Sequence, residues 1–346
     1  MRPPSVDTLA RELADIGLPH PLLVDAAREA VAAGDPASAA ARAEAVRAAL
    51  LGPVVNATGV LLHTNLGRAP LGAVPSGTYS NVELDLATGE RGSRSASAAR
   101  LVARSCSAEA ALVVNNGAAA VLLALTAVAK GRPVVVSRGE LVEIGGGFRV
   151  PEILVQSGAE LTEVGTTNRT RLADYRAVVA DVDGAVVLKV HPSNFRIVGF
   201  TESATVRQLA GLGVPVVVDI GSGLLDARTP WLASGPPGWL EGEPAAKQTL
   251  ADGADLVTFS CDKLLGGPQA GVIAGRRELV EACAGHPLAR ALRPGSLVLG
   301  ALQETLLAYL RRDGDAIPFW RMACTPVDVL RGRAEAIGVG EVVACA

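Results

Sequence analysis

The segment 260–271, SCDKLLGGPQAG, places a lysine between a strand-like apolar run and a glycine turn. Residues 256–259 (LVTF) predict a buried strand, so Lys263 would lie at the strand's end, in a cleft rather than in bulk water. Burial favours the neutral amine, which can attack an aldehyde and form a Schiff base. Ser260, three residues earlier, is placed to give its hydroxyl to a cofactor phosphate. The alternative is a surface lysine beside a turn, but the surrounding strand and glycines favour the chemical interpretation.

A carboxylate follows a second apolar run, in VPVVVDIGSG. Asp219 is either a turn residue at the strand end or the partner that keeps a pyridine nitrogen protonated and so makes the ring an electron sink. The interval from Asp219 to Lys263 leaves room for a crossover and one further strand. Both side chains can therefore reach one crevice at the carboxyl ends of a parallel sheet. Together they indicate pyridoxal 5'-phosphate as the cofactor.

The run ALVVNNGAAAVLLALTAVAK supplies a candidate phosphate cradle. A predicted strand leads into Asn115, Asn116 and Gly117, and a helix follows. The free N–H groups and the positive dipole end of that helix suit an anion. Asn and Gly are also ordinary helix caps, so a purely structural role stays open.

Several long stretches of this chain resemble the bacterial selenocysteine synthases, the L-seryl-tRNA(Sec) selenium transferase family. The resemblance runs in order over residues 53–325 and implies a decameric fold-type-I pyridoxal enzyme. Such an enzyme converts serine esterified to tRNA(Sec) into selenocysteine, with selenophosphate as the donor. The matching stretches are NATGVLLHTNLGRAPL (56–71), TGERGSR (88–94), VSRGELVEIGGGFRVPE (136–152), VGTTNRT (164–170), KVHPSNFRIVGF (189–200), FSCDKLLGGPQAG (259–271) and HPLARALR (286–293).

The resemblance also implies roles for individual residues. Lys263 would hold the cofactor and remove the α-proton of the seryl group, while Asp219 keeps the ring acidic. Asp262 is a candidate proton handler or cofactor orienter, or a cap of the glycine turn.

Three arginines match family positions that hold the oxyanion donor: Arg68, Arg290 and Arg293. Planar guanidinium groups bind such anions through paired hydrogen bonds, although each arginine could instead pair with a carboxylate. Arg290 and Arg293 would share one helix face if their segment is helical. Arg91 and Arg94 have the same spacing. We expect the three matching arginines to form one pocket, separate from the cradle.

Composition indicates one large α/β core with a small flanking unit. The chain has 346 residues, 49% hydrophobic and only 3% aromatic. Its five cysteines are an odd number without metal-ligand spacing, and the N-terminus has no signal-like segment, so we expect no metal and a reducing cytoplasm. The apolar run 118–129 is too short for a bilayer, so we expect no membrane partner, nor DNA.

We predict an α/β fold in three regions. Residues 1–51 form a helical N-terminal domain, which binds tRNA in the family; 52–300 form the large pyridoxal-phosphate domain, with a mostly parallel sheet; and 301–346 form a small, incomplete α+β domain. Family members continue further, so 334–346 would begin a strand that has no partners.

The formal net charge of −3 and an acidic N-terminal region predict weak, salt-sensitive tRNA binding. Two alternatives stay open. One is a pyridoxal lyase that eliminates ammonia from a small amino or sugar acid, without tRNA. The other is a short, catalytically impaired subunit of a homo-oligomer.

Overall fold

The computed structural model describes residues 5–50, 52–72, 79–144, 147–193, 195, 197–339, 341 and 343. Contacts divide the chain into two compact units, residues 1–57 and 58–346. The boundaries predicted near residues 52 and 300 stay predictions. Helix α12 (Ser296–Arg311) runs without interruption through residue 300 and packs on the same core as the sheet.

The first unit is a set of three helices with a core of its own. Ser5 caps α1 by accepting the N–H of Thr8 at 3.2 Å, as expected for an N-cap serine. Leu9 and Leu13 are buried, and Val6 packs against the same cluster, so the apolar face of α1 is turned toward this core. The helices are α1 (Val6–Glu12), α2 (His20–Ala32) and α3 (Ala39–Ala49), with 3-10 turns η1 (Ala14–Ile16) and η2 (Pro36–Ser38).

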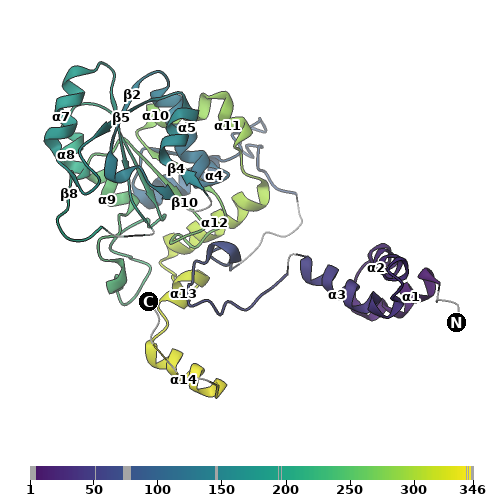
Figure 1. Cartoon of the computed structure of the whole chain (residues 1–346). Coiled ribbons are helices and arrows are strands. Elements are labelled where there is room, and N and C mark those ends of the chain that lie inside the picture. The colour runs from purple at the N-terminus through teal and green to yellow at the C-terminus, as the bar shows by residue number, and fades with distance from the viewer. Residues whose placement is uncertain are drawn as a thin grey trace. The chain divides into compact units, whose positions relative to one another are not determined.

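The second unit is built on a seven-stranded sheet in the order β1-β11-β10-β9-β7-β2-β5 (Figure 1). Only β11 runs antiparallel to its neighbours, so the predicted mostly parallel sheet is confirmed. Its strands are β1 (Ala110–Val114), β2 (Pro133–Ser137), β5 (Glu160–Val164), β7 (Val186–Val190), β9 (Val216–Gly221), β10 (Leu256–Ser260) and β11 (Gly271–Gly275).

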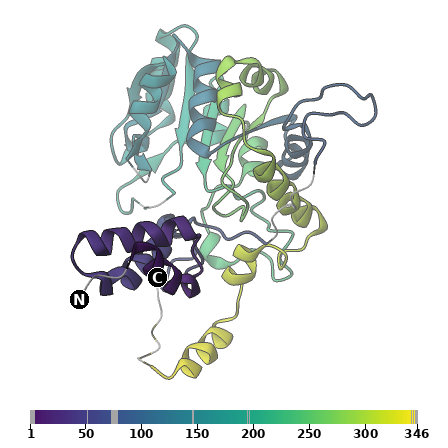
Figure 2. The ribbon, with the colours of Figure 1, turned by 90° about the vertical axis from the view of Figure 1, so that its right-hand side faces the viewer.

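Helices cover both faces of this sheet, and Figure 2 shows it between them. Alternate strand residues enter two separate cores, as the two-residue period of a strand requires. Val135 and Val187 join one core, whereas Val134 and Val186 join the other. The first core is covered by α4 (Ala96–Cys106), α7 (Leu172–Asp181), α8 (Val206–Ala210), α9 (Ala246–Ala251), α12 and α13 (Pro318–Ala323). The second is covered by α5 (Gly117–Ala129), α6 (Val150–Ser157), α10 (Arg277–Gly285) and α11 (Pro287–Ala291).

Short elements border the sheet. They are β3 (Glu143–Ile144), β4 (Phe148–Arg149), β6 (Arg169–Thr170) and β8 (Glu202–Ser203), with 3-10 turns η3 (Thr64–Leu66), η4 (Arg138–Glu140) and η5 (Gly238–Leu240). Strands β3 and β4 pair with each other, as do β6 and β8. No helix in the described ranges is long and apolar enough to cross a membrane. Those ranges also contain no cluster of three or more His, Cys, Asp or Glu side chains suited to a metal ion.

The strand predicted to begin near residue 334 is wrong for residues 334–337. They form the last turn of α14 (Val327–Ile337), which ends at Gly338 with φ +68°, a left-handed cap that glycine adopts readily. Val327 and Leu330 are three residues apart, a spacing that places both on one face of a helix. This helical spacing determines the conformation of the segment despite the β-branched residues that follow, which favour a strand. The described residues after 300 are therefore helical or irregular, not α+β.

Candidate active site

A cavity of ≈ 200 Å³ lies at the carboxyl ends of β9 and β10, beside the first turn of α5. Because β9 and β10 are parallel neighbours, the one-crossover arrangement predicted from sequence brings Asp219 and Lys263 into it. Most of the predicted site residues line this cavity: Arg68, Asn116, Gly117, Asp219, Ser260, Asp262 and Lys263.

The amine of Lys263 is largely shielded from solvent. Burial lowers its pKa below the ordinary lysine value, while the negative charge of Asp219 opposes that shift. Two of the chain's other three lysines are held in ion pairs, Lys189 with Glu140 at 2.8 Å and Lys247 with Asp226 at 3.0 Å. Among the described residues, neither Lys263 nor Lys130 has such a carboxylate partner, but Lys130 is exposed and lies outside this cavity. Lys263 is therefore the lysine best suited to act as a nucleophile.

Asp219 is buried near the end of β9 and is held in a fixed orientation. Its Oδ1 accepts the Thr258 hydroxyl at 3.0 Å and the Gly221 N–H at 3.2 Å. Burial raises the pKa of Asp219, and the hydrogen bond from Thr258 and the charge of Lys263 act in the opposite direction. A positively charged ligand atom beside Asp219 would stabilise its carboxylate.

The start of α5 forms the other wall. Asn116 caps the helix by accepting the Ala119 N–H at 2.8 Å, so the N–H groups of Gly117 and Ala118 have no intrahelical acceptor and border the cavity. A β-carbon at Gly117 would lie 2.2 Å from the Ser260 hydroxyl oxygen. Glycine at residue 117 is thus what lets the Ser260 hydroxyl and the helix N-terminus share one space, an arrangement that suits a phosphate group.

Arg68 and Asp262 form an ion pair at the rim, with Nη1 of Arg68 2.7 Å from Oδ2 of Asp262. The backbone N–H of Ala69 also donates to the carbonyl of Asp262 at 3.2 Å. These contacts fasten the segment after η3 to the turn that carries Lys263. Asp262 therefore positions Arg68 within the site.

The structure does not bring the other predicted residues into this cavity. Asn115 does not line the cavity, and its backbone N–H donates to the Leu292 carbonyl at 2.9 Å. Arg290 and Arg293 line a second cavity of ≈ 340 Å³, which we call the arginine pocket, together with Arg91 and Arg94. The single pocket expected for all three donor arginines is therefore not formed within one chain. Helix α11 ends at Ala291, so Arg290 and Arg293 also do not share a helix face.

The sequence pattern that defines the family "SelA: L-seryl-tRNA selenium transferase" matches residues 54–341. The chain belongs to this family. It is 51% identical over 294 residues to the L-seryl-tRNA(Sec) selenium transferase of Carboxydothermus hydrogenoformans, covering 82% of this chain and 61% of the relative. It is 53% identical over 275 residues to that of Moorella thermoacetica, covering 76% and 57%. The chain thus spans about three fifths of the length of these relatives.

The predicted fold is confirmed by a solved structure, "Structure of D-Glucosaminate-6-phosphate Ammonia-lyase". The TM-score is 0.50 at 21% sequence identity, over 62% of this selenium transferase family member and 57% of that chain. At this identity the likeness concerns the fold alone.

Sequence reasoning missed two residues that hold the Lys263 turn of this family member. Trp320 Nε1 donates to the Tyr309 hydroxyl at 2.6 Å, and that hydroxyl donates to the Leu265 carbonyl at 2.8 Å, all in the buried interior. Tyr309 lies on α12 and Trp320 on α13, so helices beyond the sheet fix the backbone two residues after Lys263. The sequence signal was the concentration of rare aromatics in this region.

We expect Tyr309→Phe to loosen the Lys263 turn without emptying the core. The change leaves a buried carbonyl and a buried indole N–H without their partner, which destabilises folding by about 1–3 kcal/mol. Thermal unfolding measures that loss, and the pH at which a lysine-bound cofactor changes its absorbance should also shift. Tyr175→Phe, which removes a buried hydroxyl near Ser137, is the matched control and should leave the absorbance titration unchanged. An unchanged titration in Tyr309→Phe would contradict the positioning role.

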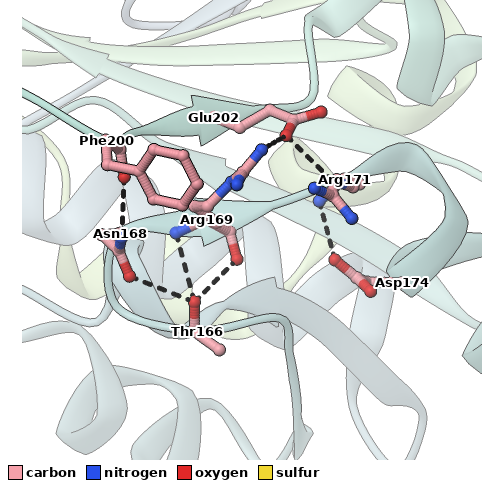
Figure 3. Close-up of polar contacts among 7 residues, drawn as sticks. All are labelled: Thr166, Asn168, Arg169, Arg171, Asp174, Phe200 and Glu202. Atoms are coloured by element: carbon pink, nitrogen blue, oxygen red, sulfur yellow. Dashed lines mark hydrogen bonds and ion pairs between the residues drawn. The ribbon is translucent and has the colours of Figure 1, made fainter.

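A third cavity, of ≈ 350 Å³, lies beside the VGTTNRT turn. Figure 3 shows the polar contacts around this turn: Glu202 Oε2 accepts from Arg169 at 2.6 Å and from Arg171 at 2.9 Å, and the Arg169 guanidinium lies 4.0 Å from the centre of the Phe200 ring. His191 also lines this cavity and lies 3.4 Å from Glu243. His191 therefore has a carboxylate neighbour within the protein. His63 does not line the Lys263 cavity.

Proposed function

We propose that this chain is a pyridoxal-phosphate-dependent selenium transferase that converts seryl-tRNA(Sec) to selenocysteyl-tRNA(Sec) with selenophosphate. The observation that carries the proposal is that Lys263, which has no ion-pair partner among the described residues, lines one cavity with Asp219 and with the N-terminus of α5. Membership of the family narrows this chemistry to selenium transfer.

The residues present fit pyridoxal 5'-phosphate. Lys263 would hold the cofactor covalently, Asp219 would face its ring nitrogen, and Ser260 with the first N–H groups of α5 would hold its phosphate. Gly117 supports this assignment, because any side chain there would displace the Ser260 hydroxyl. When bound, the cofactor supplies an electron sink for the carbon next to the amino group.

Each residue then has a separate task. The Lys263 amine, whose pKa is lowered by burial, accepts the α-proton of the seryl group. Asp219 keeps a proton at the ring nitrogen, since its fixed carboxylate is a hydrogen-bond acceptor at that position. Asp262 holds Arg68 at the rim, where the guanidinium can orient an anionic group of the substrate.

We place selenophosphate in the arginine pocket, at Arg290 and Arg293. Because one chain keeps these residues apart from Lys263, the proposal includes a homo-oligomer, in which a second copy brings the donor arginines to the site. The resemblance to a decameric family supports that assembly. A cytoplasmic location follows from the tRNA substrate.

A deuterium exchange experiment tests the proton-transfer step alone. In D2O and without a selenium donor, the cofactor-loaded protein should exchange the α-hydrogen of seryl-tRNA(Sec), measured by mass spectrometry of the released serine. Alanyl-tRNA with the same cofactor level is the comparison substrate and should exchange far more slowly if the seryl-tRNA is specifically recognised. No exchange in a fully loaded protein would contradict the proposed function.

We also expect binding of seryl-tRNA to be weak and strongly dependent on salt. The net charge of −3 provides few counter-charges for the phosphate backbone, which weakens binding, and each cationic contact that does form releases counterions, so the affinity falls as salt rises. Filter binding between about 50 and 200 mM salt measures the slope. Tight binding that does not change with salt would contradict this expectation.

A further inference from the structure

The arginine pocket contains far more positive than negative charge. Four guanidinium groups line it, and the only carboxylate among its described lining residues is that of Glu83. Two segments that are distant in the sequence form this pocket. Arg91 pairs with Leu84 in an isolated β-bridge, and Arg94 follows it. Arg290 lies in α11, and Arg293 lies just after that helix. Such a cluster suits an anion with several oxygen atoms.

Glu83 occupies the centre of this cluster. Its Oε2 accepts from Arg91 Nη2 at 2.7 Å, and its Oε1 accepts from Arg94 Nε at 2.8 Å and from Arg293 Nη1 at 3.3 Å. The hydrogen bonds from Arg94 and Arg91 lower the pKa of this carboxyl group. The Glu83 carboxylate therefore accepts hydrogen bonds from three arginines, as a bound oxyanion would.

The pocket also contains an arginine that Glu83 does not bind. Among the described residues Arg290 has no hydrogen-bond or ion-pair partner, although it lines the same cavity. The backbone of Glu83 is fixed, because its carbonyl accepts the Gly92 N–H at 3.0 Å. The side chain can thus leave the arginines by rotation while the pocket keeps its shape.

We infer that Glu83 is an internal counter-ion that fills the place of a phosphate-type dianion, and that such a dianion binds here by displacing it. A dianion with three or more oxygens can engage Arg290 as well as the three arginines that Glu83 holds, whereas a monoanion offers no more charge than Glu83 itself. Chloride or acetate would therefore displace Glu83 poorly, whereas a dianion that engages all four arginines would displace it. The inference rests on the proposed function only in one respect. The phosphate group bound here could belong to the selenium donor or to a phosphorylated cofactor.

The test is a calorimetric titration of inorganic phosphate into the full chain whose Lys263 carries the reduced cofactor, so that the cradle is filled. Glu83→Gln keeps the size of the side chain but removes the competing charge, and we expect phosphate to bind about tenfold more tightly. Acetate should gain by a similar factor, because both anions compete with the same carboxylate. Glu90→Gln is the matched control, because it makes the same charge change on the same segment outside the pocket, and we expect no change.

Arg290→Gln is a second, independent test, because Arg290 has no hydrogen-bond or ion-pair partner within the described part of the chain whose loss would disturb the fold. Phosphate affinity should fall about tenfold. Unchanged affinity in both Glu83→Gln and Arg290→Gln would overturn the inference, as would weaker phosphate binding by a folded Glu83→Gln protein. Repeating the titrations with pyridoxine 5'-phosphate separates the sources: a gain for both ligands assigns the pocket to phosphate monoesters too, and a gain for phosphate alone assigns it to a small free donor.

The outcome is separable from that of the proposed function. If Lys263 does not take up the cofactor, the same titrations on the unloaded chain still report on the arginine pocket through the Arg290→Gln difference. If Lys263 is loaded but Glu83→Gln and Arg290→Gln change nothing, only the counter-ion inference is lost.

Discussion

We expect Lys263→Ala to abolish covalent attachment of pyridoxal phosphate and to lower selenium transfer by about 10³-fold or more, because one side chain both holds the cofactor and moves the α-proton. Borohydride reduction of the wild-type protein followed by peptide mapping should place the label on Lys263. The chain has only four lysines, so the assignment is unambiguous.

The pH dependence of labelling follows from the pKa of Lys263. Because burial lowers that pKa, a larger fraction of this amine is neutral at a given pH than of an ordinary exposed lysine. Labelling of Lys263 should therefore persist to lower pH than labelling of an ordinary lysine, and decline as the pH falls through the lowered pKa. Label found mainly on Lys130, Lys189 or Lys247 would refute the site.

The second large effect concerns Asp219. Asp219→Asn keeps the shape of the side chain but removes the negative charge that holds a proton at the ring nitrogen, so cofactor should remain bound while α-hydrogen exchange slows about 10²-fold or more. Absorbance reports the bound cofactor, and deuterium exchange reports the proton transfer. Thr258→Val, which removes only the hydroxyl that orients Asp219, should slow exchange to a lesser degree.

Two further outcomes would decide against this role. Full exchange in Asp219→Asn would show that the ring nitrogen needs no carboxylate here. Complete loss of cofactor from a folded Asp219→Asn protein would assign Asp219 to binding rather than to the chemistry.

The sequence allowed the Lys263 cavity to be predicted because its residues follow strand ends. Strands β9 and β10 are mostly apolar, and the crossover between them makes them parallel neighbours, so Asp219 and Lys263 converge at their carboxyl ends. Gly117 and Ser260 could be assigned to phosphate binding from their residue types and positions. That a side chain at residue 117 would collide with the Ser260 hydroxyl is seen only in the structure.

Other features could not be predicted, since they depend on contacts between distant segments. Nothing in the sequence pairs Glu83 with Arg293 or separates Arg293 from Arg68. The single donor pocket was expected from the family resemblance. The contact of Tyr309 with Leu265 likewise arises from packing of α12 on the sheet. The strand expected near residue 334 failed because helical spacing earlier in the segment decided its conformation.

We propose that the Lys263 site performs selenium transfer on a seryl-tRNA. The most direct measurement is to incubate the cofactor-loaded chain with seryl-tRNA(Sec) and selenophosphate and to identify the amino acid released from the tRNA by mass spectrometry. The account predicts selenocysteine from the wild-type chain and none from Lys263→Ala. Unchanged serine from a folded wild-type chain that carries the cofactor on Lys263 would contradict it.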